Sequence, residues 1–277
     1  MCVTCGCGAT EDAAAGVRVT APTRAEHPHG AAHGHDHPPV DTLVLEQRVL
    51  ARNDHLAEHV RAWLAVRRIT AVNLMSSPGS GKTSLLERTI SELAPGREVC
   101  VIEGDQETTF DADRIERAGA RAVQINTGSG CHLDAAMVER ALAALAPPED
   151  SLLFVENVGN LVCPALFDIG EQAKVVVISV PEGDDKPLKY PHMFATADLV
   201  VVNKTDLLPY VDFDVQALTT RARSLNPHVT VLPLSVTSGD RMADWYAWLD
   251  TLEPGRPAPT LHRHEEGTLH GAAVVRP

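Results

Sequence analysis

The residues best suited to chemistry form the glycine-rich turn Ser76-Ser77-Pro78-Gly79-Ser80-Gly81-Lys82-Thr83. An apolar run precedes this turn and an amphipathic segment follows it, so the context is strand, turn and helix. Backbone N–H groups in such a turn point at phosphate oxygens, and the start of the helix adds positive potential. The sequence therefore predicts a phosphate-binding P-loop. Its nucleotide-binding residues are Gly79, Ser80, Gly81, Lys82, Thr83 and Ser84.

Four side chains are candidates for the catalytic work around the phosphates. We expect Lys82 to reach the β- and γ-phosphates and to face solvent when no nucleotide is bound, and the Thr83 hydroxyl to bind Mg²⁺. Asp105 closes a second strand and is placed to reach Mg²⁺ directly or through water. Glu156 closes a fourth strand and begins an acidic-x-x-Gly sequence, in which the Gly159 N–H would sense the γ-phosphate. Two acids at successive strand ends therefore predict a nucleotide-sensing switch.

A second motif selects the base. A buried strand ends in Asn203-Lys204-Thr205-Asp206, and the Asp206 carboxylate can accept from N1–H and the exocyclic amine of guanine together. Adenine lacks this pair of donors, so the motif favours GTP over ATP. We expect Asn203 to contact the base edge and the Lys204 stem to pack on the base plane. Ser235 either touches the guanine from the far side or serves as a helix cap or turn.

Metal-ligating residues form three groups. Cys2, Cys5 and Cys7 place three thiols within the first seven residues, which suits Ni²⁺ or Zn²⁺. A histidine tract over 27–37 is either a weak multiple metal site or an inert linker. The third group is Cys131, His132 and Cys163, in which Cys163 follows the predicted switch and would move with it. Cys100 lies mid-strand and is expected to belong to the core.

Composition limits the classes of function. The chain has 277 residues and a net charge of −13, which argues against nucleic acid and anionic membrane surfaces as partners. No apolar run is long enough for a membrane helix, and the N-terminus lacks the order of a signal peptide. Clustered cysteines in such a chain indicate metal or redox chemistry instead of disulfides. A cytoplasmic enzyme is therefore expected.

The domain organisation follows from hydrophobic patterning. Residues 1–42 are expected to form a disordered Cys/His metal-binding tail, 43–253 a P-loop GTPase domain with an N-terminal helix, and 254–277 an irregular tail. Alternating strand and helix patterns predict an α/β fold with a mostly parallel, doubly wound sheet of about seven strands. The predicted strands are 70–76, 98–104, 122–127, 152–157, 174–180, 198–203 and 230–235. The predicted helices are 82–94, 109–118, 133–146, 187–195, 214–224 and 239–252.

The N-terminal helix is predicted over 43–68. Val49, Leu56 and Trp63 repeat every seven residues, and they share one side with Leu45, Val60 and Leu64. This apolar side either packs on the globular body or binds a partner.

Taken together, these motifs resemble the HypB family, the nickel-incorporation GTPases of [NiFe]-hydrogenase maturation. The resemblance rests on the N-terminal CxxCGC, the P-loop with serine at position 76, and the segments that begin at Glu103, Gly130, Glu156, Lys186 and Asn203. It covers residues 43–252 and the first seven residues. It implies a homodimer that forms with GTP or metal, slow GTP hydrolysis, and transfer of Ni²⁺ to the hydrogenase large-subunit precursor with a companion metallochaperone, HypA.

The resemblance also implies two metal sites. Cys2, Cys5 and Cys7 would form the tight site, and Cys131, His132 and Cys163 a weaker one at a dimer interface. A urease-type nickel-delivery GTPase shares the same nucleotide-site logic, but the CxxCGC sequence argues against it. A metal-storage protein with a vestigial GTPase domain is the alternative from another class, and intact Lys82, Thr83 and Asp206 argue against that.

Overall fold

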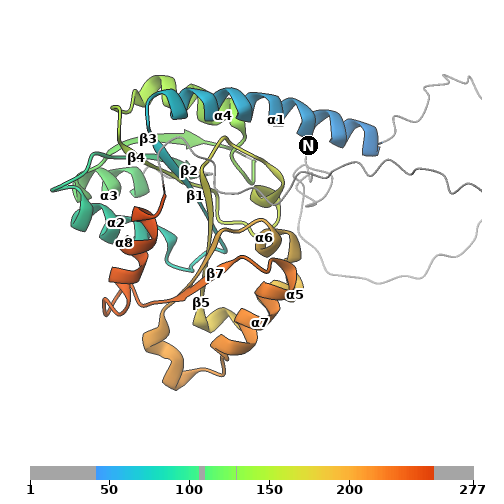
Figure 1. Ribbon diagram of the computed structural model, residues 1–277, viewed down its shortest axis with the longest axis vertical. Coiled ribbons are helices and arrows are strands. Elements are labelled where there is room, and N and C mark those ends of the chain that lie inside the picture. The colour runs from blue at the N-terminus through green and yellow to red at the C-terminus, as the bar shows by residue number, and fades with distance from the viewer. Residues whose placement is uncertain (1–41, 106–109, 129, 253–277) are drawn as a thin grey trace, which may run out of the picture. The chain divides into compact units, whose positions relative to one another are not determined.

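The structure is a computed structural model that describes residues 42–105, 110–128 and 130–252 (Figure 1). The chain divides into two compact units, 1–51 and 52–277, and the described part of the first is the beginning of helix α1 (Thr42–Val66). The predicted tails at 1–41 and 253–277 lie outside the described residues. Among the helices that the structure describes, none combines the length and apolarity that a membrane span requires.

A seven-stranded parallel sheet forms the centre of the second unit, in the order β3-β2-β4-β1-β5-β6-β7. The buried runs of β-branched residues favour strands that are covered on both faces. This confirms the predicted fold class. The strands are β1 (Thr70–Ser76), β2 (Val99–Asp105), β3 (Arg121–Asn126), β4 (Leu152–Glu156), β5 (Ala173–Ser179), β6 (Leu199–Asn203) and β7 (Thr230–Pro233).

Helices cover both faces of the sheet. On one face α2 (Lys82–Leu93), α3 (Phe110–Ala118) and α8 (Met242–Asp250) pack on side chains such as Val72 and Leu74. On the other face α4 (Ala135–Leu145) and the later turns of α1 cover β2 and β4, while α6 (Pro191–Ala195) and α7 (Val215–Leu225) cover β5 and β6. Strand side chains alternate between these two layers, as a period of two requires.

Two helical predictions need correction. The segment predicted as one helix over 187–195 forms two short helices, α5 (Lys186–Lys189) and α6, which are separated at Tyr190. Pro191 has no N–H to donate and disfavours helical backbone at the residue before it. The last helix begins at Met242 instead of 239, after Arg241 adopts left-handed backbone. Three 3₁₀ segments were not predicted: η1 (Cys163–Leu166), η2 (Val180–Glu182) and η3 (Thr205–Tyr210).

The buried face of α1 differs from the predicted apolar stripe. From residue 52 onward the helix packs on the body through Val60 and Leu64, as predicted, and also through Asn53 and Ala57, while Leu56 and Trp63 are only partly buried. The reason is a close approach at Gly170. A β-carbon there would lie 2.7 Å from Val60 Cγ1 and 2.8 Å from the Ala57 carbonyl oxygen, so position 170 has no room for a side chain.

Candidate functional site: a P-loop beside a cysteine-histidine cluster

The P-loop connects β1 to α2, as predicted. Ser76 ends the strand, Gly79 and Gly81 adopt positive φ angles of 76° and 93°, and α2 begins at Lys82. Among the described residues no side chain caps the first turn of α2. The N–H groups at this helix start are therefore available to an anion, which is the arrangement a nucleotide phosphate requires.

Asn203, at the end of β6, holds the P-loop in place. Its Nδ2 donates to the Ser80 carbonyl at 2.9 Å, and its Oδ1 accepts from the N–H groups of Lys204 (2.7 Å) and Val236 (3.2 Å). The side chain is buried. This geometry assigns Asn203 a positioning role, and its expected contact with the base edge stays a prediction. Gly81 makes it possible, because a β-carbon there would overlap Asn203 Nδ2.

Gly81→Ala is expected to weaken nucleotide binding by at least about 100-fold, since it combines left-handed backbone strain of roughly 1–2 kcal/mol with this overlap. Gly79→Ala is the matched control. It has a similar positive φ, but no described heavy atom lies within 4 Å of the added carbon. It should therefore cost only the strain, about tenfold. Fluorescent GDP titration measures both, and equal losses would contradict the assigned contact.

Glu156 stands at the centre of the phosphate end of the site. Its Oε1 accepts from Lys82 Nζ and from Thr83 Oγ1, each at 2.6 Å. The Lys82 and Glu156 side chains are 10% and 3% exposed, so the expectation that Lys82 faces solvent without nucleotide was wrong. An ion pair this buried is held by mutual attraction that solvent screens little.

Asp105 ends β2, and Gly159 follows β4, the strand beside β1. Because β4 separates β1 from β2, and Glu103 pairs with Glu156 in the β2–β4 register, Asp105 lies one strand farther out than Glu156. Oxygen donors from Thr83, Glu156 and Asp105 suit Mg²⁺, and the outer position of Asp105 favours contact through water. A β-carbon on Gly159 would lie 3.4 Å from Pro78 Cγ, so the predicted switch touches the P-loop.

The base-recognition residues meet at the neighbouring strand ends. Ser235 Oγ donates to Asp206 Oδ1 at 2.5 Å, and Lys204 Nζ donates to the Gly79 carbonyl at 2.7 Å. Ser235 is buried and also accepts from the Ser238 N–H, whereas Asp206 is exposed. The Ser235 hydroxyl thus orients the Asp206 carboxylate through Oδ1, and Asp206 as a whole is exposed to solvent. Contact of Asp206 and Ser235 with guanine stays a prediction.

The structure brings together the third predicted metal group. The ligand atoms of Cys131, His132 and Cys163 all lie within 4.8 Å of one another, and Cys131 Sγ is 3.6 Å from His132 Nδ1. A tetrahedral ion with bonds of about 2.0–2.3 Å holds ligand atoms roughly 3.5 Å apart. Burial lowers the pKa of His132, which favours the neutral imidazole that metals bind. The ring stacks on Phe167 at 3.9 Å, which fixes its plane.

The other cysteines divide between core and tail. Cys100 is fully buried in the core, as predicted. Cys2, Cys5 and Cys7, together with the histidine tract, lie outside the described residues, so their role stays a prediction.

Sequence reasoning missed three polar side chains of the site. Ser77 donates to Glu182, which also accepts from the Ser179 N–H and hydroxyl and so ties the P-loop to η2. Asn157 and Asn160 bond to the backbone near Cys131. Ser77, Asn157 and Asn160 lie within the predicted motif segments, but their partners are remote in sequence and gave no local signal.

Comparison with known proteins agrees with this geometry. Residues 70–233 match the family described as CobW/HypB/UreG, nucleotide-binding domain. The chain is 57% identical over 208 residues to hydrogenase maturation factor HypB of Azotobacter vinelandii. This alignment covers 75% of this chain and 69% of the relative. The crystal structure of the maturation factor HypB from Archaeoglobus fulgidus is 40% identical with a TM-score of 0.67, and covers 72% of this chain and 98% of that one.

A second solved structure is HypB from Helicobacter pylori in complex with nickel. It is 37% identical to this chain with a TM-score of 0.69, and covers 73% of this chain and 97% of that one. The family match spans the P-loop, the predicted switch, the cysteine-histidine cluster and the base-recognition motif. The chain therefore belongs to the CobW/HypB/UreG family of P-loop GTPases and, within it, to the HypB hydrogenase maturation factors.

Proposed function

We propose that this GTPase delivers nickel to the large-subunit precursor of [NiFe]-hydrogenase, and that GTP hydrolysis switches its metal affinity and its dimerisation. The observation that carries the proposal is the short segment between the two sites. Glu156, which bonds Lys82 and Thr83, ends β4, and Cys163, which belongs to the metal cluster, begins η1 only seven positions later. A rearrangement at the phosphates therefore has a direct covalent route to a metal ligand.

The nucleotide site would act by positioning and by charge. Lys82 would compensate charge on the β- and γ-phosphates, and Asp206 would select guanine. Thr83 and Asp105 would hold Mg²⁺, which neutralises phosphate charge when bound. Binding of the phosphates by Lys82 and of Mg²⁺ by Thr83 would release both from Glu156, because each has a bond to Glu156 Oε1 in this structure.

The metal cluster would hold nickel as cargo. Two thiolates and an imidazole suit Ni²⁺, with Zn²⁺ as an alternative occupant. The cluster offers three ligands among the described residues, which leaves a coordination position for a donor or acceptor chain. We further propose that Cys2, Cys5 and Cys7 form the tighter site, and that the working species is a cytoplasmic homodimer that cooperates with HypA.

Cys131→Ala is expected to weaken nickel binding at the cluster by at least about 10- to 100-fold while leaving the tail site intact, since a lost ligand costs no less than a lost supporting group. Cys100→Ala is the matched control, because Cys100 is also buried but belongs to the core. Cys5→Ala should abolish the tight site alone. Nickel–thiolate absorption during titration distinguishes the sites, and a Cys131→Ala protein with unchanged weak-site affinity would overturn the assignment.

A further inference from the structure

We propose that Asn157 is the positioning residue that couples the nucleotide site to the Cys131/His132/Cys163 cluster, with Asn160 as a second connection. The proposal rests on the proposed function, since it explains how one site would sense the other. In this proposal the side-chain hydrogen bonds of Asn157 and Asn160 carry the coupling, in addition to the covalent connection from Glu156 to Cys163.

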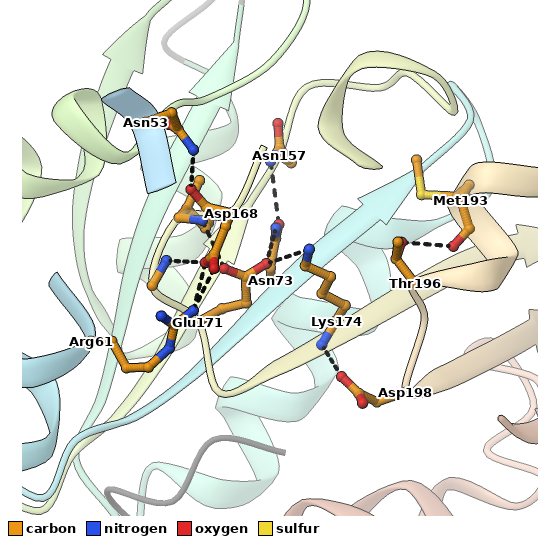
Figure 2. A network of polar contacts seen from close by, with 12 residues as sticks. Asn53, Arg61, Asn73, Asn157, Asp168, Glu171, Lys174, Met193, Thr196 and Asp198 are labelled. Atoms are coloured by element: carbon orange, nitrogen blue, oxygen red, sulfur yellow. Dashed lines mark hydrogen bonds and ion pairs between the residues drawn. The ribbon is translucent and has the colours of Figure 1, made fainter. Parts of the chain in front are cut away.

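The Asn157 side chain is fully buried and bonds on two sides. Its Nδ2 donates to Asn73 Oδ1 at 3.3 Å, as Figure 2 shows, and its Oδ1 accepts from the Leu133 N–H at 3.1 Å. The same Oδ1 accepts from the Val158 N–H at 3.0 Å. One amide group therefore joins β1, the switch and the loop that carries His132.

The nucleotide side of this connection is the preceding residue. Glu156 is peptide-bonded to Asn157 and bonds Lys82 and Thr83 through a single carboxylate oxygen. The Asn157 N–H donates to the Leu74 carbonyl at 2.9 Å, within the strand that leads to the P-loop. A shift of the Glu156 backbone when phosphate engages Lys82 would therefore move the backbone that carries Asn157, or strain these bonds.

The metal side is held at two points. Leu133 directly follows His132, so the bond from its N–H to Asn157 fixes the backbone beside a ligand. Asn160 Nδ2 donates to the Cys131 carbonyl at 3.3 Å, and its Oδ1 accepts from the Val162 N–H, next to Cys163. All three cluster residues are thus adjacent to, or part of, a backbone unit bonded to the switch asparagines.

The other partner of Asn157 is fixed. Asn73 lies in β1, at the centre of the sheet, and its Nδ2 donates to Glu171 Oε1 at 3.2 Å. Glu171 in turn accepts from the Ile169 N–H and faces Lys174 Nζ at 3.6 Å (Figure 2). Asn157 is therefore anchored on the β1 side to a buried polar network, and on the other side it bonds the loop that carries His132.

The test measures a coupling factor: the affinity for a non-hydrolysable GTP analogue with saturating Ni²⁺ divided by the affinity without it. The full chain carries substitutions of Cys2, Cys5 and Cys7, so that the measurement responds to nickel at the Cys131/His132/Cys163 cluster alone. Asn157→Ala is expected to lower the coupling factor at least about fivefold, toward one, and Asn160→Ala to lower it by less. The matched control is Asn226→Ala, because Asn226 is a buried asparagine that bonds the Ala197 carbonyl and the His228 N–H away from both sites.

The possible coupling factors distinguish failure of the proposed function from failure of the inference about Asn157. A coupling factor of one in the parent protein would overturn the proposed function and this inference together. A coupled parent whose Asn157→Ala and Asn160→Ala variants keep the full factor would overturn this inference alone, as would an equal loss in Asn226→Ala. If Asn157→Ala does not fold, the test rests on Asn160→Ala, because Asn160 is only half-buried. An unchanged coupling factor in Asn160→Ala would then overturn the inference.

Discussion

Lys82→Ala is expected to lower the rate of GTP hydrolysis by at least about 10²- to 10³-fold, the scale of losing one fixed charge-stabilising group at a phosphoryl site. The reason is that Lys82 is the P-loop lysine at the start of α2, where it would compensate charge that develops on the β- and γ-phosphates. Phosphate release under single-turnover conditions measures the effect.

The same substitution also has a structural cost. It removes the ion partner of Glu156, which is 3% exposed, and breaking a buried pair costs about 3–5 kcal/mol. Lys82→Gln is therefore the better variant, because its amide can still donate to Glu156 while the charge is lost. We expect it to lose less thermal stability than Lys82→Ala and to be as inactive. A Lys82→Gln protein with normal hydrolysis would remove Lys82 from catalysis.

Asp206→Asn is expected to weaken GTP binding by at least about 100-fold and to favour xanthosine triphosphate. A site built for a specific hydrogen-bond pattern leaves groups unpaired when the pattern is reversed. The structure supports this role, because Ser235 Oγ holds one oxygen of Asp206 at 2.5 Å and orients the other. Competition between guanosine and xanthosine triphosphates, measured by displacement of a fluorescent nucleotide, checks the change.

Two further variants test whether the loss of GTP affinity is specific to Asp206 and its partner. Asp212→Asn is the matched control, because it removes the same charge from an exposed residue six positions farther along the chain. Ser235→Ala should weaken GTP binding by about tenfold, the worth of one hydrogen bond to a charged group. Equal GTP affinity in Asp206→Asn and in the unsubstituted protein would exclude Asp206 from the base site.

The sequence predicted the positions of the motifs better than the contacts of their side chains. Seven parallel strands were recognisable because buried β-branched runs such as Leu199–Asn203 alternate with amphipathic segments. Since parallel strands end at one edge, Lys82, Glu156 and Asp206 were expected to gather there. The Cys131/His132/Cys163 cluster was expected from the family resemblance, and the structure brings its ligand atoms together.

Features that depend on tertiary contacts were missed. Lys82 is buried because Glu156 accepts from it, and the two are 74 positions apart in sequence. The buried face of α1 includes Ala57 as well as the predicted Val60, and both approach Gly170 at close range. Asn203 bonds the P-loop across 123 positions, so its motif gave no sign of that role. Hydrophobic periodicity records average burial and contains no information on such individual partners.

The central claim is that nucleotide state changes metal affinity at the Cys131/His132/Cys163 cluster. The most direct test is to titrate Ni²⁺ into protein that lacks the tail cysteines, once with GDP and once with a non-hydrolysable GTP analogue. We predict nickel dissociation constants that differ by at least about fivefold between the two states, with the reciprocal effect of nickel on nucleotide affinity that linkage requires. Identical nickel affinities in both states would contradict the account, and would leave a GTPase and a metal site that share a chain without communicating.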